Sequence, residues 1–477
     1  MMDSPNEGIS SSPTFLISQL SDPSFISSIC RPFINGDIIP ETFSLSYAEN
    51  VLIPNVIHNI NERNIDALNN IPDVAKLLVD NLGEDGLNLI LQSVLPALQN
   101  CLRATSSTTS HDMMKLIGDT ICSISTKYRD DVFVEVISKA SSDTESKLRI
   151  LAAYLIPLVH DSSRVLFNFR SLSLDRVTQV RCELLKNLPN CTFDESLLQY
   201  VLINASKDQN VVVRRAAAAI FGKVAPQKID EFIPLLTNKE TVKSALRSMK
   251  DIVIENGLTP LSIAFHDACY LEPELSAAVV LNVSRVVPDE EKRLVLKFAY
   301  LLKLTNNMIT HLFKFSEIFP DKDFFVDMLE PDVVQQPWRS RRSMLEQARL
   351  FVPILGDKLA RIAEIYSRDP VAMIRNLSVG LWIELIKFDE SLTVDAKRLI
   401  SEAWQTRLVL SKIIKEYGVS PHFEETFQIL SKDEVSNVRY SAAVTALQIG
   451  VECFDKLFGE CEDKDILILR NEIKIEG

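Results

Sequence analysis

Glycine is scarce in this sequence, with only 13 glycines among 477 residues. Loops that cradle phosphate groups, dinucleotide-binding folds and tight β-hairpins need glycine where φ is positive or where the backbone approaches a ligand closely. This scarcity argues against a nucleotide-binding α/β enzyme and favours a protein built from helices.

Motifs of catalysis and metal binding are also missing from the sequence. It contains no HExxH, no pair of CxxC motifs, no GxSxG and no phosphate-binding loop. Its six histidines never occur in pairs at the spacing of metal ligands on a helix. We therefore expect no catalytic residues, no metal site and no cofactor, and a protein that is not an enzyme.

The eight cysteines are scattered through apolar stretches. Two pairs close in sequence, Cys182 with Cys191 and Cys453 with Cys461, could act as redox pairs. The alternative is that all eight are reduced, small, buried residues at helix crossings, which is the usual role of free cysteine. We favour this second interpretation.

The sequence has no excess of positive charge, because 64 acidic residues oppose 51 basic ones and give a net charge of −13. This charge repels polyphosphate, so we expect no nucleic-acid partner. No run of 18 apolar residues is present to insert into a membrane, and the first residues lack the basic and apolar regions of a signal peptide. We expect a cytoplasmic protein, with the nucleus as a second location.

What the sequence does contain is a repeat. Five segments share an aspartate, an arginine six residues later, and an apolar residue directly before that arginine. Four and eight residues beyond each apolar residue lie further small or apolar residues, which is the stripe of one helix face. Each aspartate is therefore expected in a turn that caps the following helix, with the arginine in its first turn. The segments begin and end at Asp143–Arg149, Asp175–Arg181, Asp208–Arg214, Asp369–Arg375 and Asp433–Arg439.

The spacing of these segments indicates a solenoid. Successive arginines lie 32 residues apart from Arg149 to Arg181, 33 from Arg181 to Arg214, and 64, or two steps, from Arg375 to Arg439. One such unit holds two helices and cannot bury its apolar face alone, so neighbouring units must stack. We expect an all-α fold, a curved solenoid of about a dozen helical pairs.

Apolar stretches that contain proline lie between the segments, at 51–57, 93–102 and 231–236. We interpret them as first helices of pairs, bent or started by the proline. The domain organisation that follows is a disordered tail (1–12), a degenerate first repeat (13–45), N-terminal repeats (46–250), diverged middle repeats (251–330), C-terminal repeats (331–455) and an eroded final repeat (456–477).

The recurring aspartates and arginines have two interpretations. Each arginine could bond an aspartate of its own or the next turn, forming a ladder that fixes how repeats stack, or it could contact a partner at the edge of the turn. The ladder is favoured for Arg149, Arg181, Arg375 and Arg439. Arg214–Arg215 and the segment Trp338–Arg342 are expected to add basic groups beyond the ladder, together with an aromatic residue of the type enriched in binding hot spots.

An aspartate turn followed by Val-Arg and an alanine-rich helix resembles HEAT repeats, although the spacing is shorter than the usual period of about 40 residues. Within that class the sequence is similar to the scaffolding (A) subunit of protein phosphatase type 2A, as a divergent member. The similarity lies in four segments that follow the family's order along the chain: QNVVVRRAAAAIFGKVA (209–225), QPWRSRRSMLEQARLFVPILGDKL (336–359), DPVAMIRNLSVGLWIEL (369–385) and DEVSNVRYSAAVTALQIG (433–450).

The resemblance implies a scaffold that performs no chemistry and whose partners are a phosphatase catalytic subunit and an interchangeable regulatory subunit. Metal ions would belong to the catalytic partner. The resemblance implies that the catalytic subunit binds Trp338, Arg339, Arg341, Arg375, Arg439 and Tyr440. It implies that the regulatory subunit binds Arg181, Arg214 and Arg215. The chain departs from the family in holding fewer repeats, in Glu434 where the family has proline, and in lacking the Val-Arg pair around His111–Met114.

Two other classes of protein remain as alternatives. One is another HEAT-repeat adaptor, such as a nuclear transport receptor or a vesicle-coat component, for which the net charge of −13 would suit basic cargo. The other is an enzyme with a helical domain, which the missing motifs disfavour.

Overall fold

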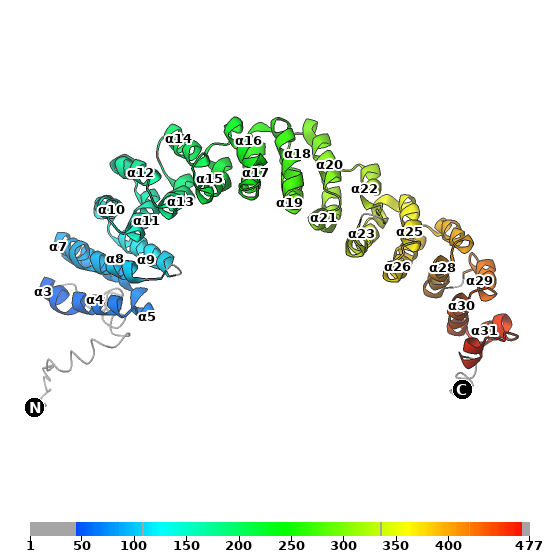
Figure 1. Ribbon diagram of the computed structural model, residues 1–477. Helices are drawn as coiled ribbons and strands as arrows, with labels where there is room; N and C mark the ends of the chain where they lie inside the picture. The colour runs from blue at the N-terminus through cyan, green and yellow to red at the C-terminus, as the bar shows by residue number, and fades with distance from the viewer. Residues whose placement is uncertain (1–43, 107–108, 334–335, 419, 470–477) are drawn as a thin grey trace, which may run out of the picture. The chain divides into compact units, whose positions relative to one another are not determined.

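The computed structural model describes residues 44–106, 109–333, 336–418 and 420–469, and within these ranges the chain forms helices and no strands. The chain divides into two compact units, Met1–Ser248 and Met249–Gly477. In each unit, successive helices lie side by side in chain order (Figure 1). The predicted all-α fold is confirmed.

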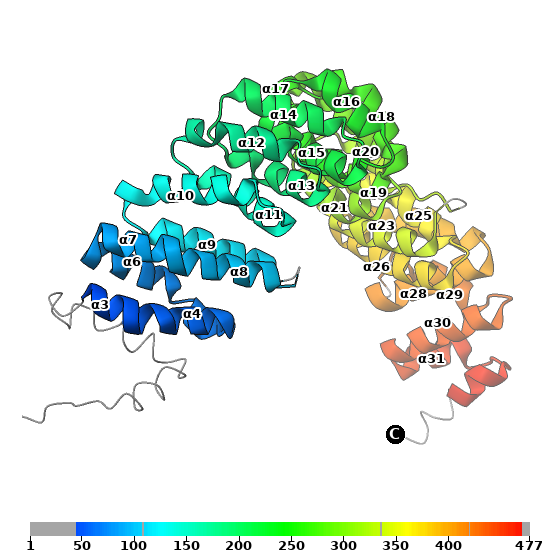
Figure 2. The ribbon, with the colours of Figure 1, turned by 60° about the vertical axis from the view of Figure 1, so that its left-hand side comes forward.

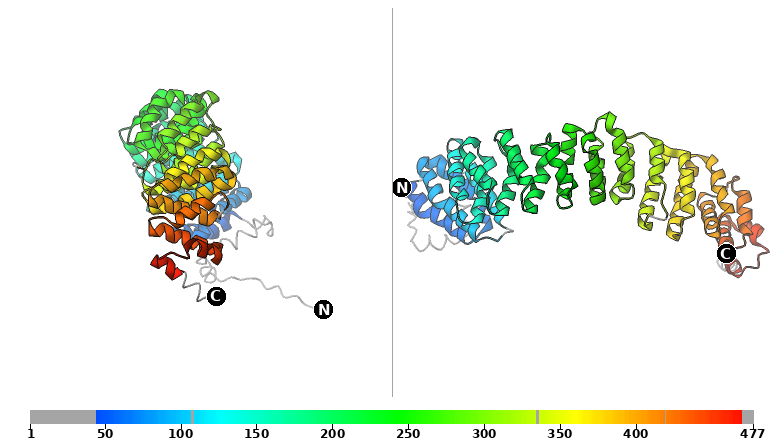
Figure 3. Two further views of the ribbon diagram at one scale, coloured as in Figure 1. Left: turned by 90° about the vertical axis from the view of Figure 1, so that its right-hand side faces the viewer. Right: turned by 45° about the horizontal axis from the view of Figure 1, so that its top comes forward.

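The first unit is built from pairs of antiparallel helices. Figure 2 and the right-hand view of Figure 3 show these helices one after another, from the blue end of the chain to the green part. The pairs are α4 (Ile53–Asn61) with α6 (Ile71–Leu82), α8 (Leu95–Ala104) with α9 (Ser110–Ser123), α10 (Thr126–Ser141) with α11 (Ser146–Leu155), α12 (Leu166–Ser173) with α13 (Thr178–Asn187), α14 (Glu195–Ser206) with α15 (Val211–Val224), and α16 (Ile229–Thr237) with α17 (Val242–Asn256), which crosses into the second unit.

The second unit is itself built from helical pairs. Its pairs are α18 (Ser262–Leu271) with α19 (Pro273–Val283), α20 (Lys292–Leu301) with α21 (Asn306–Ser316), α22 (Lys322–Leu329) with α23 (Trp338–Leu350), α25 (Ala360–Ser367) with α26 (Ala372–Phe388), α27 (Thr393–Lys397) with α28 (Trp404–Tyr417), and α29 (Glu424–Ser431) with α30 (Ser436–Ile449), followed by α31 (Val451–Phe458).

The second helices of successive pairs pack on one another. In the first unit α11 contacts α13 and α13 contacts α15, and in the second unit contacts run from α19 through α21, α23, α26 and α28 to α30. Each pair therefore buries its apolar face against its neighbours, as expected for a solenoid. About a dozen helical pairs are present in the described part of the chain, as predicted.

The apolar stripe that defined the repeat forms the core. The residues before the five arginines are buried, as are the residues four and eight positions further on. Trp382, one of these, is fully buried, and its indole N–H donates to the Ser367 hydroxyl at 3.0 Å. The stripe residues are Leu148, Ala152 and Ile156; Val180, Leu184 and Leu188; Val213, Ala217 and Phe221; Ile374, Ser378 and Trp382; and Val438, Ala442 and Ala446.

Proline shapes the first helices, as predicted. A π-helical turn, η2 (Ala48–Leu52), stands directly before α4, which contains Pro54, and another, η3 (Ile90–Val94), stands before α8, which contains Pro96. Proline has no backbone N–H and its ring clashes with the carbonyl four residues earlier, so the wider π-helical turn relieves the clash. Pro234 lies inside α16.

The predicted tail (1–12) and nearly all of the degenerate first repeat (13–45) lie outside the described residues. The region 251–330 forms helices α18 to α22, and α31 extends into 456–477. No helix in the described ranges is long and apolar enough to cross a membrane. The functional boundaries between the repeats stay predictions.

We expect Leu188→Ala to lower the free energy of unfolding by about 2–5 kcal/mol, because Leu188 is fully buried and truncation leaves a cavity. Leu174→Ala is the matched control, since Leu174 is 79% exposed, and it should change stability by less than about 0.5 kcal/mol. Urea unfolding followed by circular dichroism measures both variants. Because a solenoid is held by contacts between neighbours, the loss can appear as melting of the first unit alone. Equal stability of the two variants would contradict the assignment of Leu188 to the core.

Candidate functional site

The turns that join the first helix of a pair to the second are built in one way. In the turn before α13, the Asp175 carboxylate accepts a hydrogen bond from the Val177 N–H at 2.8 Å. Four further aspartate carboxylates each accept a hydrogen bond from the backbone N–H two residues later, at 2.8 Å in each turn. They belong to Asp143, Asp208, Asp369 and Asp433. Each aspartate thus lies in the turn and satisfies a backbone N–H ahead of the helix, as its position predicted.

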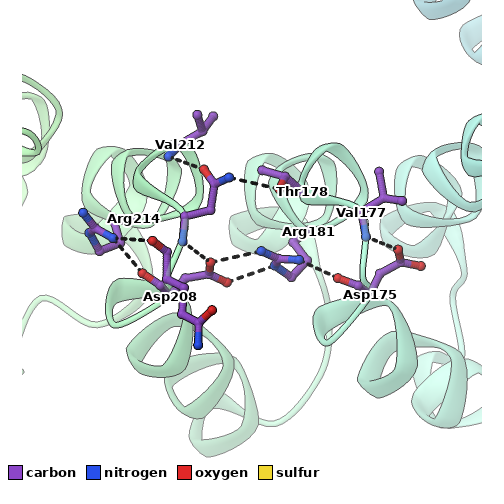
Figure 4. A network of polar contacts seen from close by, with 9 residues as sticks. Asp175, Val177, Thr178, Arg181, Asp208, Val212 and Arg214 are labelled. Carbon is purple, nitrogen blue, oxygen red and sulfur yellow. Dashed lines mark hydrogen bonds and ion pairs between the residues drawn. The ribbon is translucent and has the colours of Figure 1, made fainter.

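The arginines of the repeat tie each turn to the next. Arg181 Nη1 donates to the carbonyl of Asp175 in its own turn at 2.6 Å, while its Nε and Nη2 donate to the carboxylate of Asp208 in the next turn at 2.9 and 3.0 Å (Figure 4). We call such a two-point bond between repeats a rung. The same two-point geometry recurs at Arg149–Asp175, Arg341–Asp369 and Arg407–Asp433.

The two remaining arginine–carboxylate bonds of the ladder are made at a single point. Arg214 Nη2 lies 2.5 Å from the Glu240 carboxylate, because Asn238 occupies the aspartate position of that turn. Arg439 pairs with Asp463. The ladder interpretation is therefore correct for Arg149, Arg181 and Arg439, with one refinement: each takes a carbonyl from its own turn and a carboxylate from the next. Arg375 takes only the carbonyls of its own turn among the described residues.

The rung between Arg341 and Asp369 is the most deeply buried. Its side chains are 5% and 0% exposed. A charge at such a depth is tolerated only when it is paired and its hydrogen bonds are satisfied. The rung therefore fixes α23 and α26 in one relative position, and its geometry leaves little room for adjustment.

Two arginines that we expected beyond the ladder belong to it. Arg214 is a member through Glu240, and Arg341 is a rung whose side chain is almost fully covered. The expectation of extra basic groups at these two positions is wrong. The carboxylates that bind Arg214 and Arg341 lie 26 and 28 residues later in the chain, and the repeat pattern did not link them to these arginines. Arg215 is exposed, and its Nε donates to the Glu240 carbonyl at 2.6 Å.

Trp338 stands exposed above the buried rung. It is the first residue of α23, follows Pro337, and has 37% of its surface exposed. The guanidinium of Arg339 lies 5.4 Å from the centroid of its ring, a cation–π contact. Arg342, one turn further on, is exposed and pairs with Glu346 at 2.9 Å.

A second tryptophan occupies the equivalent position two pairs later. Trp404 is the first residue of α28, is also 37% exposed, and lies three residues before the rung arginine Arg407, as Trp338 lies three before Arg341. Trp404 and Arg407 fall outside the repeat pattern found in the sequence, because Ser401 stands at the aspartate position of that repeat. The shared signal Trp-x-x-Arg would have found them.

These residues form one surface in the second unit, which we call the turn ridge: residues 336–342, 369–376, 401–408 and 433–440. Besides the two tryptophans it exposes Met373 (45%) and Tyr440 (41%). Each lies in the first or second turn of a second helix whose other face is buried. An exposed apolar surface of this kind, repeated in register above fixed rungs, is typical of a protein-binding site.

Arg375 lies on the turn ridge and differs from the other arginines of the ladder. Its Nη1 donates to the carbonyls of Asp369 and Pro370 at 2.6 and 2.9 Å, as in the other repeats. Among the described residues no carboxylate pairs with its Nε or Nη2. Serine stands at 401, the position of the aspartate in the next turn.

The middle repeats connect their turns by another bond. Glu274, in the first turn of α19, accepts hydrogen bonds from the N–H groups of Asn306 and Asn307 at the start of α21, at 2.8 and 3.0 Å. A carboxylate at the N-terminus of a helix is favourable because free N–H groups point outward there. This bond therefore connects neighbouring second helices in the way that rungs do elsewhere.

A groove opens in the first unit between the first helices α12 and α14. Its volume is about 920 Å³, and Leu184 and Leu185 of α13 lie among the residues that line it. Exposed Leu174 and Tyr200 line the groove beside the Arg181–Asp208 rung. Its lining is mainly apolar, with serine and arginine side chains around it.

Among the described residues, no group of three or more histidine, cysteine or acidic side chains is placed to hold a metal ion. The described cysteines, including both candidate redox pairs, are free thiols. Burial raises the pKa of the Cys191 thiol to about 12 and also raises the pKa of Cys182 and of Cys453. Because the thiolate is the reactive form, these shifts make the three thiols poor nucleophiles.

No protein-family model matches the sequence, and no curated protein matches it. Solved structures with a similar fold include Kap95p with RanGDP (9% identity, TM-score 0.44, 95% of this chain and 70% of that one) and importin beta (12%, 0.41, 96% and 65%). A homology model of the AP-3 complex also matches (12%, 0.30, 95% and 85%). The stacked pairs and the ladder themselves make this chain a HEAT-type helical repeat protein.

We expect Asp369→Ala to destabilise the second unit by about 3–5 kcal/mol, because it leaves the buried Arg341 guanidinium without its carboxylate. Glu346→Ala removes the partner of Arg342 in an exposed pair and should cost no more than about 0.5 kcal/mol. Thermal unfolding of both variants measures the difference. A loss at Asp369 as small as that at Glu346 would show that the rung does not hold the repeats together.

The stability of the Arg407–Asp433 rung should depend on acid pH. Burial by itself would raise the pKa of Asp433, but hydrogen bonds from Arg407 and the Val435 N–H outweigh it, and the net pKa is lowered. A carboxyl whose folded-state pKa is lowered adds stability above its unfolded pKa of about 3.9, and this stability is lost as the pH falls through the folded value. The melting temperature of Asp433→Asn should therefore lie well below that of the unmodified protein at pH 7 and approach it below pH 4. A gap that stays constant from pH 7 to pH 3 would contradict the linkage.

Proposed function

We propose that this protein is a non-catalytic scaffold that holds a Ser/Thr protein phosphatase catalytic subunit on the turn ridge of its second unit and a regulatory subunit on its first unit. The observation that carries the proposal is the pair of equivalent, exposed tryptophans, Trp338 and Trp404, each three residues before a rung arginine. The ridge is a binding surface, and the ladder beneath it is the support.

The chemistry of the ridge favours a protein partner. A tryptophan side chain can bury about 150–250 Å² at an interface, and tryptophan and arginine dominate the binding energy of many complexes. Exposed as they are, Trp338 and Trp404 gain only part of that area within the fold itself. Rungs position the helices that carry them, so the surface is preorganised and a partner loses less entropy on binding.

The identity of the partner is supported by the sequence resemblance. Three of the four segments that resemble the phosphatase scaffold, at 336–359, 369–385 and 433–450, supply most of the turn ridge. Trp338, Arg339 and Tyr440 are exposed there and are the proposed contacts. Trp404 joins this set, whereas Arg341 and Arg439 act through the ladder. A transport receptor or coat adaptor would use the same kind of surface, and it is the second candidate.

The regulatory subunit is proposed to bind the turns of the first unit. Val212 and Arg215 are exposed in the first two turns of α15, beside the part-buried Arg214. Arg181 and Arg214 contribute by holding their turns in place. The groove between α12 and α14 opens next to the Arg181–Asp208 rung and offers the same partner an apolar surface.

A scaffold of this kind acts by raising effective concentration. When two proteins bind the same chain, their encounter becomes intramolecular, which can strengthen their association by orders of magnitude without any new contact. The catalytic subunit carries the chemistry, and the regulatory subunit selects the substrate.

The test is capture of a purified type 2A phosphatase catalytic subunit by the scaffold and by the double variant Trp338→Ala/Trp404→Ala. Loss of a hot-spot residue typically costs 2 kcal/mol or more, so affinity should fall at least about thirtyfold for each tryptophan. The melting temperature should change little, because both side chains are partly exposed at helix N-termini.

Tyr300→Ala provides the control, since Tyr300 is an exposed aromatic residue on a first helix of the second unit, away from the turn ridge. It should bind like the unmodified scaffold. The scaffold alone should hydrolyse no phosphorylated peptide. Full-strength capture by the double tryptophan variant, or phosphatase activity of the chain by itself, would refute the proposed function.

A further inference from the structure

Within the described ranges, the guanidinium of Arg375 is hydrogen-bonded on one edge only, and its other edge is the one that binds a carboxylate in the rungs. In four two-point rungs, arginine Nη1 is anchored by a carbonyl of its own turn while Nε and Nη2 hold both oxygens of an aspartate in the next turn. At Arg375 the anchoring half is complete, with two carbonyls on Nη1. The carboxylate half has no partner within the described part of the chain.

The reason lies in the next turn. In the two-point rungs the accepting aspartate stands three residues before the second helix, as Asp369 does before α26 and Asp433 before α30. The corresponding residue before α28 is Ser401, which donates to the Arg398 carbonyl and carries no charge. The neighbouring Glu402 pairs with Arg368 at 2.7 Å, and its carbonyl accepts from Arg407. The acidic side chain of this turn is therefore already engaged.

We propose that Arg375 binds a carboxylate of the partner, an aspartate or glutamate side chain that completes the missing rung from outside. A guanidinium anchored on one edge presents its other two donors in the fork that matches a carboxylate, and such charge-assisted, two-point bonds are about twice as strong as neutral ones. This inference rests on the proposed function, because it names the chemistry of the partner on the same ridge.

The surroundings of Arg375 define the segment that it recognises. Met373, in the same turn of α26, and Trp404, in the next repeat, are both exposed. An acidic residue flanked by apolar residues would pair with the guanidinium while its neighbours cover the methionine and the tryptophan. Covering the pair excludes water, which strengthens the ionic bond. The partner segment is therefore acidic at one position and apolar on either side of it.

The experiment measures the affinity of the purified phosphatase catalytic subunit for Arg375→Gln, Arg375→Lys and, as the matched control, Arg361→Gln. Arg375→Gln should weaken binding about thirtyfold, a loss typical of an interface hot spot. Arg375→Lys keeps the charge but not the fork, so it should lose roughly tenfold, since a point charge does not replace a two-point bond. Arg361→Gln should bind normally, because Arg361 lies on the first helix α25, away from the turn ridge, and pairs with Glu330 at 3.3 Å.

A second variant, Ser401→Asp, supplies the carboxylate from within. It should raise the melting temperature and weaken capture, because an internal rung then competes with the partner, whereas uncharged Ser401→Asn should do neither. Full affinity of both Arg375 variants, while Trp404→Ala loses binding, would overturn the inference and leave the proposed function intact. If Trp404→Ala and both Arg375 variants bind at full strength, the proposed function itself fails.

Discussion

The bond between an arginine of one repeat and an aspartate of the next is the interaction on which the arrangement of this protein depends. A helical pair cannot stand alone, and apolar packing between second helices permits sliding as well as contact. The two-point bond from Arg181 to Asp208, closed on the other side by the Asp175 carbonyl, is satisfied in only one register. Apolar burial supplies most of the stability, and the rung determines the register in which the repeats stack.

This arrangement divides the work between residues that lie close together. Arg341 is buried and holds α23 to α26, while Trp338, three residues earlier on the same helix, remains exposed. Arg407 and Trp404 repeat the division on α28. One short stretch of helix thus provides both the joint and an exposed aromatic side chain, so each tryptophan is carried by a helix that an ion pair holds to the next repeat.

Much of this could be predicted from the sequence, because the turn, the first helical turn and the buried stripe are local features. The aspartate turns and the burial of Leu184 and Trp382 follow from spacing alone. The burial of Arg341 in an ion pair does not follow from spacing. Its partner Asp369 lies 28 residues later and also belongs to another segment of the pattern. Trp404 was missed for the opposite reason: its turn has lost the aspartate that the pattern required. Exposure and pairing between repeats are properties of the stack, and a single repeat does not contain them.

The bond made by Glu274 in the middle repeats has a consequence for how this sequence can change. A joint made of two side chains is lost when either one mutates, so both must be kept or replaced together. Glu274 bonds the backbone N–H groups of Asn306 and Asn307, which nearly every amino acid possesses. Only one side chain then has to be conserved. The side chains around that joint can therefore change without breaking it, and a faint repeat pattern between 251 and 330 is compatible with a joint of this kind.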